Sequence, residues 1–76
     1  MKQVTIQLDT IDKVRNFVQT ISLFNSDFDM VSGRYTVDGK SILGIFSLDL
    51  SKPIDLVIYD DREVSDILKQ IDEYLV

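Results

Sequence analysis

Gly39-Lys40-Ser41 is the first place in this sequence where residue types and spacing suggest chemistry, because the three residues match the end of a phosphate-binding loop. Such a loop also carries a glycine upstream and lies within a parallel βαβ unit. Neither feature accompanies the motif in this sequence. We therefore do not expect nucleotide binding here.

Asp60, Asp61 and Glu63 offer clustered carboxylate oxygens, which are the ligands that hard cations prefer. The glycine-containing loop of an EF-hand is missing, so we predict no metal site. We interpret these acids as the start of a helix, where the macrodipole favours negative charge. Asp27 and Asp29 lie two positions apart on an expected strand and are interpreted as solubilising residues.

Two chemically versatile residue types are absent from the sequence. The chain has no histidine, which removes the usual general base, phosphohistidine chemistry and the commonest metal ligand. It has no cysteine, which removes disulfides and thiolate chemistry and fits the reducing cytosol. We predict that the protein is not an enzyme, binds no cofactor and is cytoplasmic.

Length and charge narrow the possible functions further. The 76 residues allow one domain, 1–76, and a hydrophobic fraction of 45% with 28% charged residues is typical of a globular chain. Thirteen acidic against eight basic residues give a net charge of -5, without a basic cluster, so nucleic acid is not an expected partner. No apolar run approaches the ~20 residues of a membrane helix, so no membrane association is predicted.

Alternating apolar residues predict strands with one buried face. Val4, Ile6 and Leu8 show this period of two, and Pro53, which lacks an amide proton, should precede the last strand. The expected strands are 2–8, 28–32, 35–38 and 54–59.

Apolar residues at helical spacing predict three helices. Their expected ranges are 11–23, 41–48 and 62–75, with a buried strand as the alternative for 41–48. Thr10 and Ser41 are the expected N-caps of the first two helices.

The order βαββαβα predicts an α+β fold with two layers, in which three helices cover one face of a four-stranded antiparallel sheet. Val31, Val57 and Tyr59 would then fall on the uncovered face. They are either isolated surface residues or a small apolar patch. The patch would make the chain a generic interaction module or a homodimer that uses the open sheet face.

At this point the sequence resembles the HPr family, the small phosphocarrier proteins of the bacterial sugar phosphotransferase system. The resemblance rests on the element order, on residues 18–20 (VQT) and above all on residues 39–48 (GKSILGIFSL). It implies an open-faced β-sandwich.

The family relays phosphate through a histidine at the start of the first helix, which is followed after one residue by Arg-Pro. The resemblance puts Thr10 at the histidine, with Asp12 and Lys13 at the arginine and proline. A hydroxyl without an adjacent base is a weak phosphoacceptor, and Asp12 would repel phosphate. We expect no catalytic residue and no relay from phosphoenolpyruvate.

The family's second site is a serine at the start of the short second helix, which HPr kinase phosphorylates in many low-GC Gram-positive bacteria. Ser41 occupies that position, and Lys40 adds a nearby cation. A phosphate there would meet backbone amides and the positive end of the helix dipole. The alternative is that Ser41 is only an N-cap.

Exposed apolar side chains around that serine dock the family's protein partners. Ile42, Leu43 and Phe46 match them, which implies binding to HPr kinase and, further, to enzyme I or transport subunits. Alternatively Ile42, Ile45 and Leu48 are core residues, and Leu43 and Phe46 fold onto the first helix. The leading hypothesis is a monomeric regulatory HPr-like protein without the relay histidine.

Overall fold

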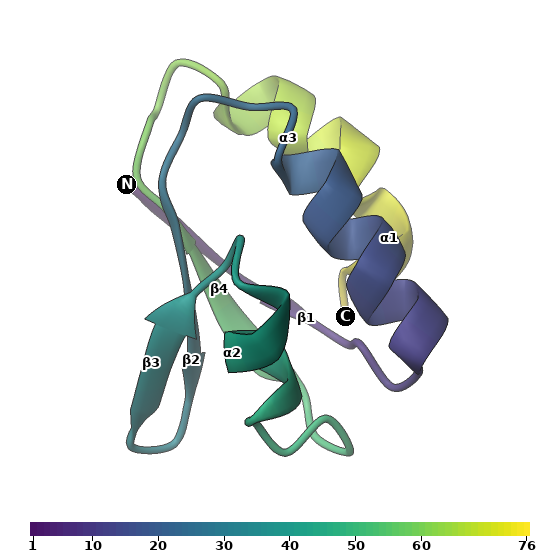
Figure 1. Ribbon diagram of the computed structural model, residues 1–76. Helices are drawn as coiled ribbons and strands as arrows, with labels where there is room; N and C mark the ends of the chain where they lie inside the picture. The colour runs from purple at the N-terminus through teal and green to yellow at the C-terminus, as the bar shows by residue number, and fades with distance from the viewer.

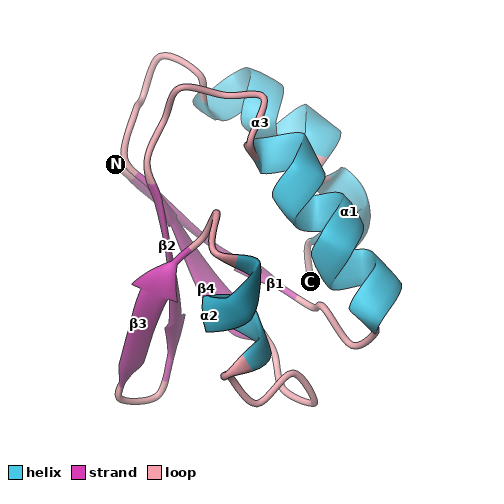
Figure 2. Cartoon of the chain, in the orientation of Figure 1, coloured by secondary structure: helices cyan, strands magenta, loops and turns pink.

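A computed structural model describes the whole chain, residues 1–76. The elements follow in the order β1 (Lys2–Ile6), α1 (Ile11–Ile21), β2 (Phe28–Ser32), β3 (Tyr35–Asp38), α2 (Ile42–Phe46), β4 (Ile54–Ile58), α3 (Val64–Gln70) and a 3-10 turn, η1 (Asp72–Tyr74). Figure 1 shows the chain as one layer of strands and one layer of helices, in which the short α2 contacts α1. Figure 2 shows the same division by element type. The predicted open-faced α+β fold is confirmed.

The four strands form one antiparallel sheet in the order β1-β4-β2-β3. Its register places one residue from each strand in a row that faces the helices: Val4, Leu56, Met30 and Val37. The strands at 28–32 and 35–38 are confirmed at both ends. β2 and β4 are neighbours, as the proposed patch on the open face requires.

The core lies between the sheet and the helices. α1 contributes Val14, Phe17 and Ile21, whose spacing puts them on one side of the helix, and all three are fully buried. The Phe17 ring meets the Tyr74 ring edge to face at 5.6 Å between centroids. Burial raises the pKa of Tyr74 to about 12, so its hydroxyl stays protonated and Tyr74 packs into the core as a neutral side chain, whereas Asp72 and Glu73 of η1 are exposed.

Several predicted elements end earlier than expected. β1 stops at Ile6 instead of residue 8, because the Gln7 amide donates to Tyr74 O at 2.8 Å and leaves the ladder. Leu8 is nevertheless fully buried. α1 ends at Ile21 instead of residue 23, where the Leu23 amide turns to the carbonyl three residues back. β4 ends at Ile58 instead of residue 59.

The last helix differs most from the expectation of 62–75. α3 begins at Val64, so Asp60 and Asp61 lie in the preceding loop and do not form the helix start. The Asp60 carboxylate accepts hydrogen bonds from the Arg62 amide and guanidinium, which holds the loop in a tight turn. The Leu75 bridge to Ile6 ends the helical segment.

Candidate functional site

Ser41 begins α2 as its N-cap, with the side-chain oxygen accepting a hydrogen bond from the Gly44 amide at 3.1 Å. This confirms that the 41–48 block forms a helix and not a strand, although the helix itself covers only Ile42–Phe46. A Cβ on Gly44 would lie 3.1 Å from Ser41 Oγ and 3.2 Å from Val37 Cβ. The glycine therefore lets the capped end of α2 lie close against β3. The Ser41 residue is half-buried.

Lys40 has a different contact from the one that the sequence suggested. Its Nζ donates to Phe24 O at 2.8 Å, just beyond α1, and lies 5.6 Å from the Phe28 ring centroid. Its backbone amide donates to Asp38 Oδ1 at 2.9 Å. Lys40 thus ties the end of α1 to the start of α2, and its ammonium is bound to a carbonyl rather than to Ser41.

The apolar residues of α2 divide between the core and the surface. Leu43 is 80% exposed and Phe46 is 38% exposed, whereas Ile45 is fully buried. Ile42, which the family pattern placed on the surface, is half-buried and packs against the core. Leu48 is buried as well. The exposed apolar surface of α2 therefore consists of Leu43 and the outer part of Phe46, which we call the α2 patch.

Thr10 is the N-cap of α1, and its hydroxyl accepts from the Lys13 amide at 3.1 Å. The Lys13 ammonium pairs with Asp9 Oδ1 at 2.9 Å, and this hydrogen bond lowers the pKa of Asp9. Asp12 adds a second exposed carboxylate in the first turn. The start of α1 therefore presents a hydroxyl between two acids, with its nearest cation already paired.

The predicted residues Thr10 and Ser41 lie at the starts of two different helices, and the structure does not gather them into one pocket. α1 and α2 contact each other. The Lys40 bond to Phe24 O puts the start of α2 beside the end of α1.

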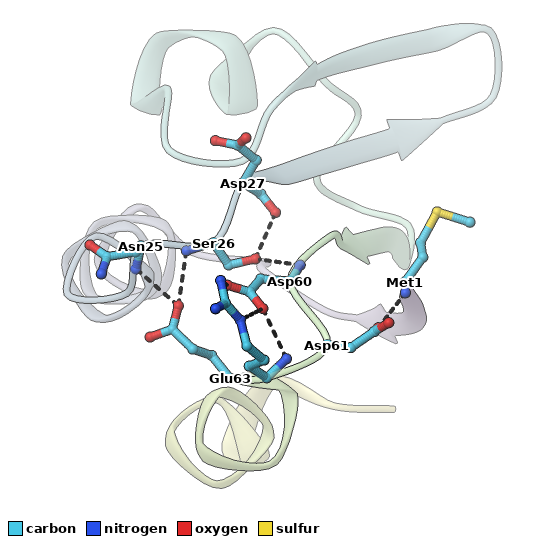
Figure 3. Close-up of polar contacts among 8 residues, drawn as sticks. Met1, Asn25, Ser26, Asp27, Asp60, Asp61 and Glu63 are labelled. Atoms are coloured by element: carbon cyan, nitrogen blue, oxygen red, sulfur yellow. Dashed lines mark hydrogen bonds and ion pairs between the residues drawn. The ribbon is translucent and has the colours of Figure 1, made fainter.

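Contacts that the sequence did not suggest hold together the loop before β2 and the loop before α3. Glu63 Oε1 accepts from the Asn25 and Ser26 amides at 3.1 Å each, and Ser26 Oγ accepts from the Asp60 amide at 3.0 Å (Figure 3). Asp61 pairs with the terminal ammonium of Met1. These carboxylates each bind a different partner, and together they fix the loop before β2 to the loop before α3. No periodic signal in the sequence marks such links between loops.

The open sheet face carries the three residues that the alternative hypothesis singled out. Val57 is only 9% exposed and Val31 is half-buried, whereas Tyr59 is 47% exposed. The Tyr59 hydroxyl donates to Asp29 Oδ2 at 2.6 Å, which raises the pKa of Tyr59. The apolar part of this face is therefore small, and its polar part includes Asp29.

No helix of the chain combines the length and the apolar character needed to cross a membrane.

The comparisons with known proteins support the resemblance. No family model matches the sequence. Among solved structures, the fold is similar to HPr-C-His of Thermoanaerobacter tengcongensis, with a TM-score of 0.79 and 30% identity over 96% of this chain and 89% of that one. It is also similar to the phosphocarrier protein HPr of Bacillus anthracis str. Ames, with a TM-score of 0.68 and 26% identity over 99% of this chain and 94% of that one. With this identity over nearly its whole length and the same open-faced fold, the chain belongs to the HPr family.

Proposed function

We propose that this protein is a regulatory, protein-binding member of the HPr family that does not relay phosphate and is not itself an enzyme. The observation that carries the proposal is the surface at α2, where Ser41 caps the helix and the following residues Leu43 and Phe46 are exposed. In this proposal the protein is cytoplasmic and monomeric and binds proteins of the sugar phosphotransferase system.

The start of α1 supports the absence of a relay. Thr10 has no imidazole base beside it, because the chain contains no histidine. An alkyl phosphoester on a hydroxyl is a poorer phosphoryl donor than phosphohistidine. The carboxylates of Asp9 and Asp12 would repel an incoming phosphate, since Lys13 is already paired with Asp9.

The start of α2 is electrostatically better suited to a phosphate. Its first turn contains no acidic residue, and the backbone amides at a helix start favour an anion. HPr kinase would transfer the γ-phosphoryl group of ATP to Ser41 Oγ, with the hydroxyl proton taken by a base of the kinase and ADP released. The Lys40 ammonium would pair with that phosphate only by leaving Phe24 O.

The α2 patch supports protein binding. An apolar side chain that is 80% exposed, as Leu43 is, gains free energy when a partner covers it. Phe46 adds an aromatic ring of the kind that often dominates the energetics of an interface. HPr kinase is the partner that Ser41 requires, and enzyme I or transport subunits would use the same surface.

The direct test is intact-mass measurement after incubation with ATP and an HPr kinase, and separately with phosphoenolpyruvate and enzyme I. Wild type and Ser47→Ala, which alters an exposed serine of the same segment, should gain one phosphoryl group from ATP, and Ser41→Ala should gain none. No variant should gain mass from phosphoenolpyruvate. Addition from phosphoenolpyruvate would show that the chain is a relay after all. No addition from ATP would leave Ser41 as a helix cap.

A further inference from the structure

The Gly39-Lys40-Ser41 turn, which is similar to the end of a phosphate-binding loop, is held against β2. The Gly39 amide donates to Phe28 O at 2.9 Å, and a Cβ on Gly39 would lie 2.7 Å from Phe28 Cβ. Because two side-chain carbons do not approach so closely, the glycine lets the turn pass this strand without displacing it. Lys40, the next residue, therefore starts from a fixed point on the sheet.

Lys40 is held at its backbone and at the end of its side chain. Its amide donates to Asp38 Oδ1 at 2.9 Å, and its Nζ donates to Phe24 O at 2.8 Å in a partly buried contact. The ammonium also lies 5.6 Å from the centroid of the Phe28 ring, within the range of a cation–π interaction. An unrestrained lysine samples many rotamers, so these contacts fix a side chain that would otherwise be mobile. The fixed residue is the one directly before Ser41.

Ser41 is placed by the same turn. Its amide donates to Asp38 O at 3.0 Å, and its Oγ accepts from the Gly44 amide at 3.1 Å. Its hydroxyl donates no hydrogen bond, whereas the Ser47 hydroxyl of the same segment donates to Gly44 O. The fold therefore holds the Ser41 oxygen in place and leaves its proton free for a base.

Lys40 can affect Ser41 through position rather than through contact. No hydrogen bond joins the two side chains, and the ammonium is already bound to Phe24 O. Without that bond, the start of α2 would lose its side-chain link to the end of α1 and would be held only by the turn itself. The Ser41 oxygen would then take up several positions, and a displacement of about 1 Å is enough to slow a group transfer strongly.

We propose that Lys40 is a positioning residue for the phosphorylation of Ser41. Its bond to Phe24 O fixes the start of α2 relative to α1, so that a kinase bound to the α2 patch meets Ser41 Oγ at one place. In the transfer, Oγ attacks the γ-phosphorus of ATP, a base of the kinase takes the hydroxyl proton, and ADP leaves. This inference rests on the proposed function and adds to it a residue that contacts neither the phosphoryl group nor the reacting oxygen.

The test is the steady-state kinetics of phosphorylation of the full chain by HPr kinase at saturating ATP, followed by intact mass. Lys40→Met keeps an unbranched side chain over the Phe28 ring but removes the donor to Phe24 O. Its kcat should fall about tenfold while its KM changes less than about twofold, because the α2 patch is intact and only the placement of Oγ is lost. Lys40→Arg keeps a charged donor and should recover most of the wild-type kcat.

Two further variants separate position from charge. Asp38→Ala removes the carboxylate that holds the Lys40 amide but leaves the lysine charge in place, and it should lower kcat about threefold without changing KM. Lys52→Met removes one charge from an exposed side chain that makes no hydrogen bond, and it should leave both constants within about twofold of wild type. Amide hydrogen exchange checks the fold: in Lys40→Met the Gly44 amide should exchange about threefold faster, while the β4 amides stay protected.

The proposal is overturned if Lys40→Met keeps the wild-type kcat, or if Lys40→Arg is as slow as Lys40→Met. A raised KM with unchanged kcat would also overturn it, because Lys40 would then contact the kinase directly. If Lys40→Met does not fold, Asp38→Ala decides by the same criteria. A wild-type chain that gains no phosphoryl group would overturn the proposed function and this inference with it, whereas phosphorylated wild type with an unaffected Lys40→Met overturns this inference alone.

Discussion

α1 and α2 begin with the same cap in different surroundings. Thr10 and Ser41 each accept a hydrogen bond at 3.1 Å from the amide three residues ahead. Thr10 is exposed and is followed by Asp12 in the first turn, whereas Ser41 is half-buried and the first turn of α2 has no acid. Identical local geometry therefore gives two sites with different electrostatics.

Under the proposed function, a capping hydroxyl does not define a phosphate site by itself. The two caps differ in the charges near the hydroxyl oxygen and in the neighbouring surface. The Lys13–Asp9 ion pair lies near Thr10, whereas the exposed Leu43 and Phe46 follow Ser41. The four predictions below test this difference.

The largest expected effect comes from rebuilding the family's relay motif at α1. The triple variant Thr10→His, Asp12→Arg, Lys13→Pro should change phosphoryl incorporation from phosphoenolpyruvate and enzyme I from none to a readily measured fraction, because it supplies an imidazole acceptor and a cation. Proline at 13 removes the amide that Thr10 caps, but the same variant also removes the capping hydroxyl. Intact mass under non-acidic conditions measures the outcome.

The control is Thr10→His alone, which should incorporate much less because Asp12 remains. If wild type already incorporates phosphate from phosphoenolpyruvate, the contrast between the two helix starts is wrong.

The second prediction concerns the two residues of the α2 patch. Phe46→Ala should lower the free energy of unfolding by about 2 kcal/mol, roughly half the cost of truncating a fully buried phenylalanine, because its ring is 38% exposed. Leu43→Ala should cost less than about 0.5 kcal/mol, since that side chain is mostly in water. Urea unfolding gives both values.

Both variants should also weaken phosphorylation of Ser41 by HPr kinase, measured as kcat/KM, if the α2 patch is the docking surface. Leu43→Ala separates the effect on binding from the effect on stability, because it should slow the kinase reaction while hardly changing the free energy of unfolding. Unchanged kinetics in both variants would remove the patch from the proposed interface.

The third prediction compares the two caps directly. Ser41→Ala and Thr10→Ala should each lower the free energy of unfolding by about 1 kcal/mol through loss of the side-chain acceptor. We expect the larger loss at Ser41, because its Gly44 amide donor is half-buried and less able to bond to water. Equal losses in chemical denaturation would mean that burial does not distinguish the caps.

The smallest expected effect is a pH dependence confined to the start of α1. The Lys13 side chain lowers the pKa of Asp9 below its ordinary value of 3.8, so this contribution to stability is present above that pH and is lost as pH falls through the lowered pKa. Lys13→Gln should therefore reduce stability slightly at pH 7 and leave it nearly unchanged at the acid end of the range. The difference in urea midpoint between the two pH values measures it, and the same loss at both would contradict the assignment.

The fold was largely predictable from periodicity. Alternation in β2 and β3 predicted both ends of each strand, and the apolar residues at helical spacing predicted α1 (Ile11, Val14, Val18 and Ile21, with Phe17 and Phe24 beside them), although Ile11 is 61% exposed in the structure. Two of the wrongly predicted element boundaries lie where a segment hydrogen-bonds to another segment far away in the sequence. β1 ends early because Tyr74 takes the Gln7 amide. α3 begins late because the preceding loop is bound to the loop before β2, through Ser26 and Glu63. No local pattern reports such partners.

The candidate site was predictable in part. The caps at Thr10 and Ser41 follow from residue type before an apolar run, and the structure has both. The burial of Ile42 and the bond from Lys40 to Phe24 O were not expected, because they depend on how α2 lies against the core and α1. The opposition of Asp29 and Asp38 required the strand register, which a sequence alone gives only through the hairpin.

The sequence by itself determined the order of elements, the faces that each buries, the N-caps and the absence of histidine chemistry, because these depend on residue type and on neighbours three or four positions away. The tertiary structure decided which exposed residues stand together. Leu43 and Phe46 remain exposed because α2 presents Ile42 and Ile45 to the core. Asp29 and Asp38 lie opposite each other on the open face because β2 pairs with β3 in that register. The first result depends on how α2 packs against the core and the second on the β2–β3 register, and residue type alone sets neither.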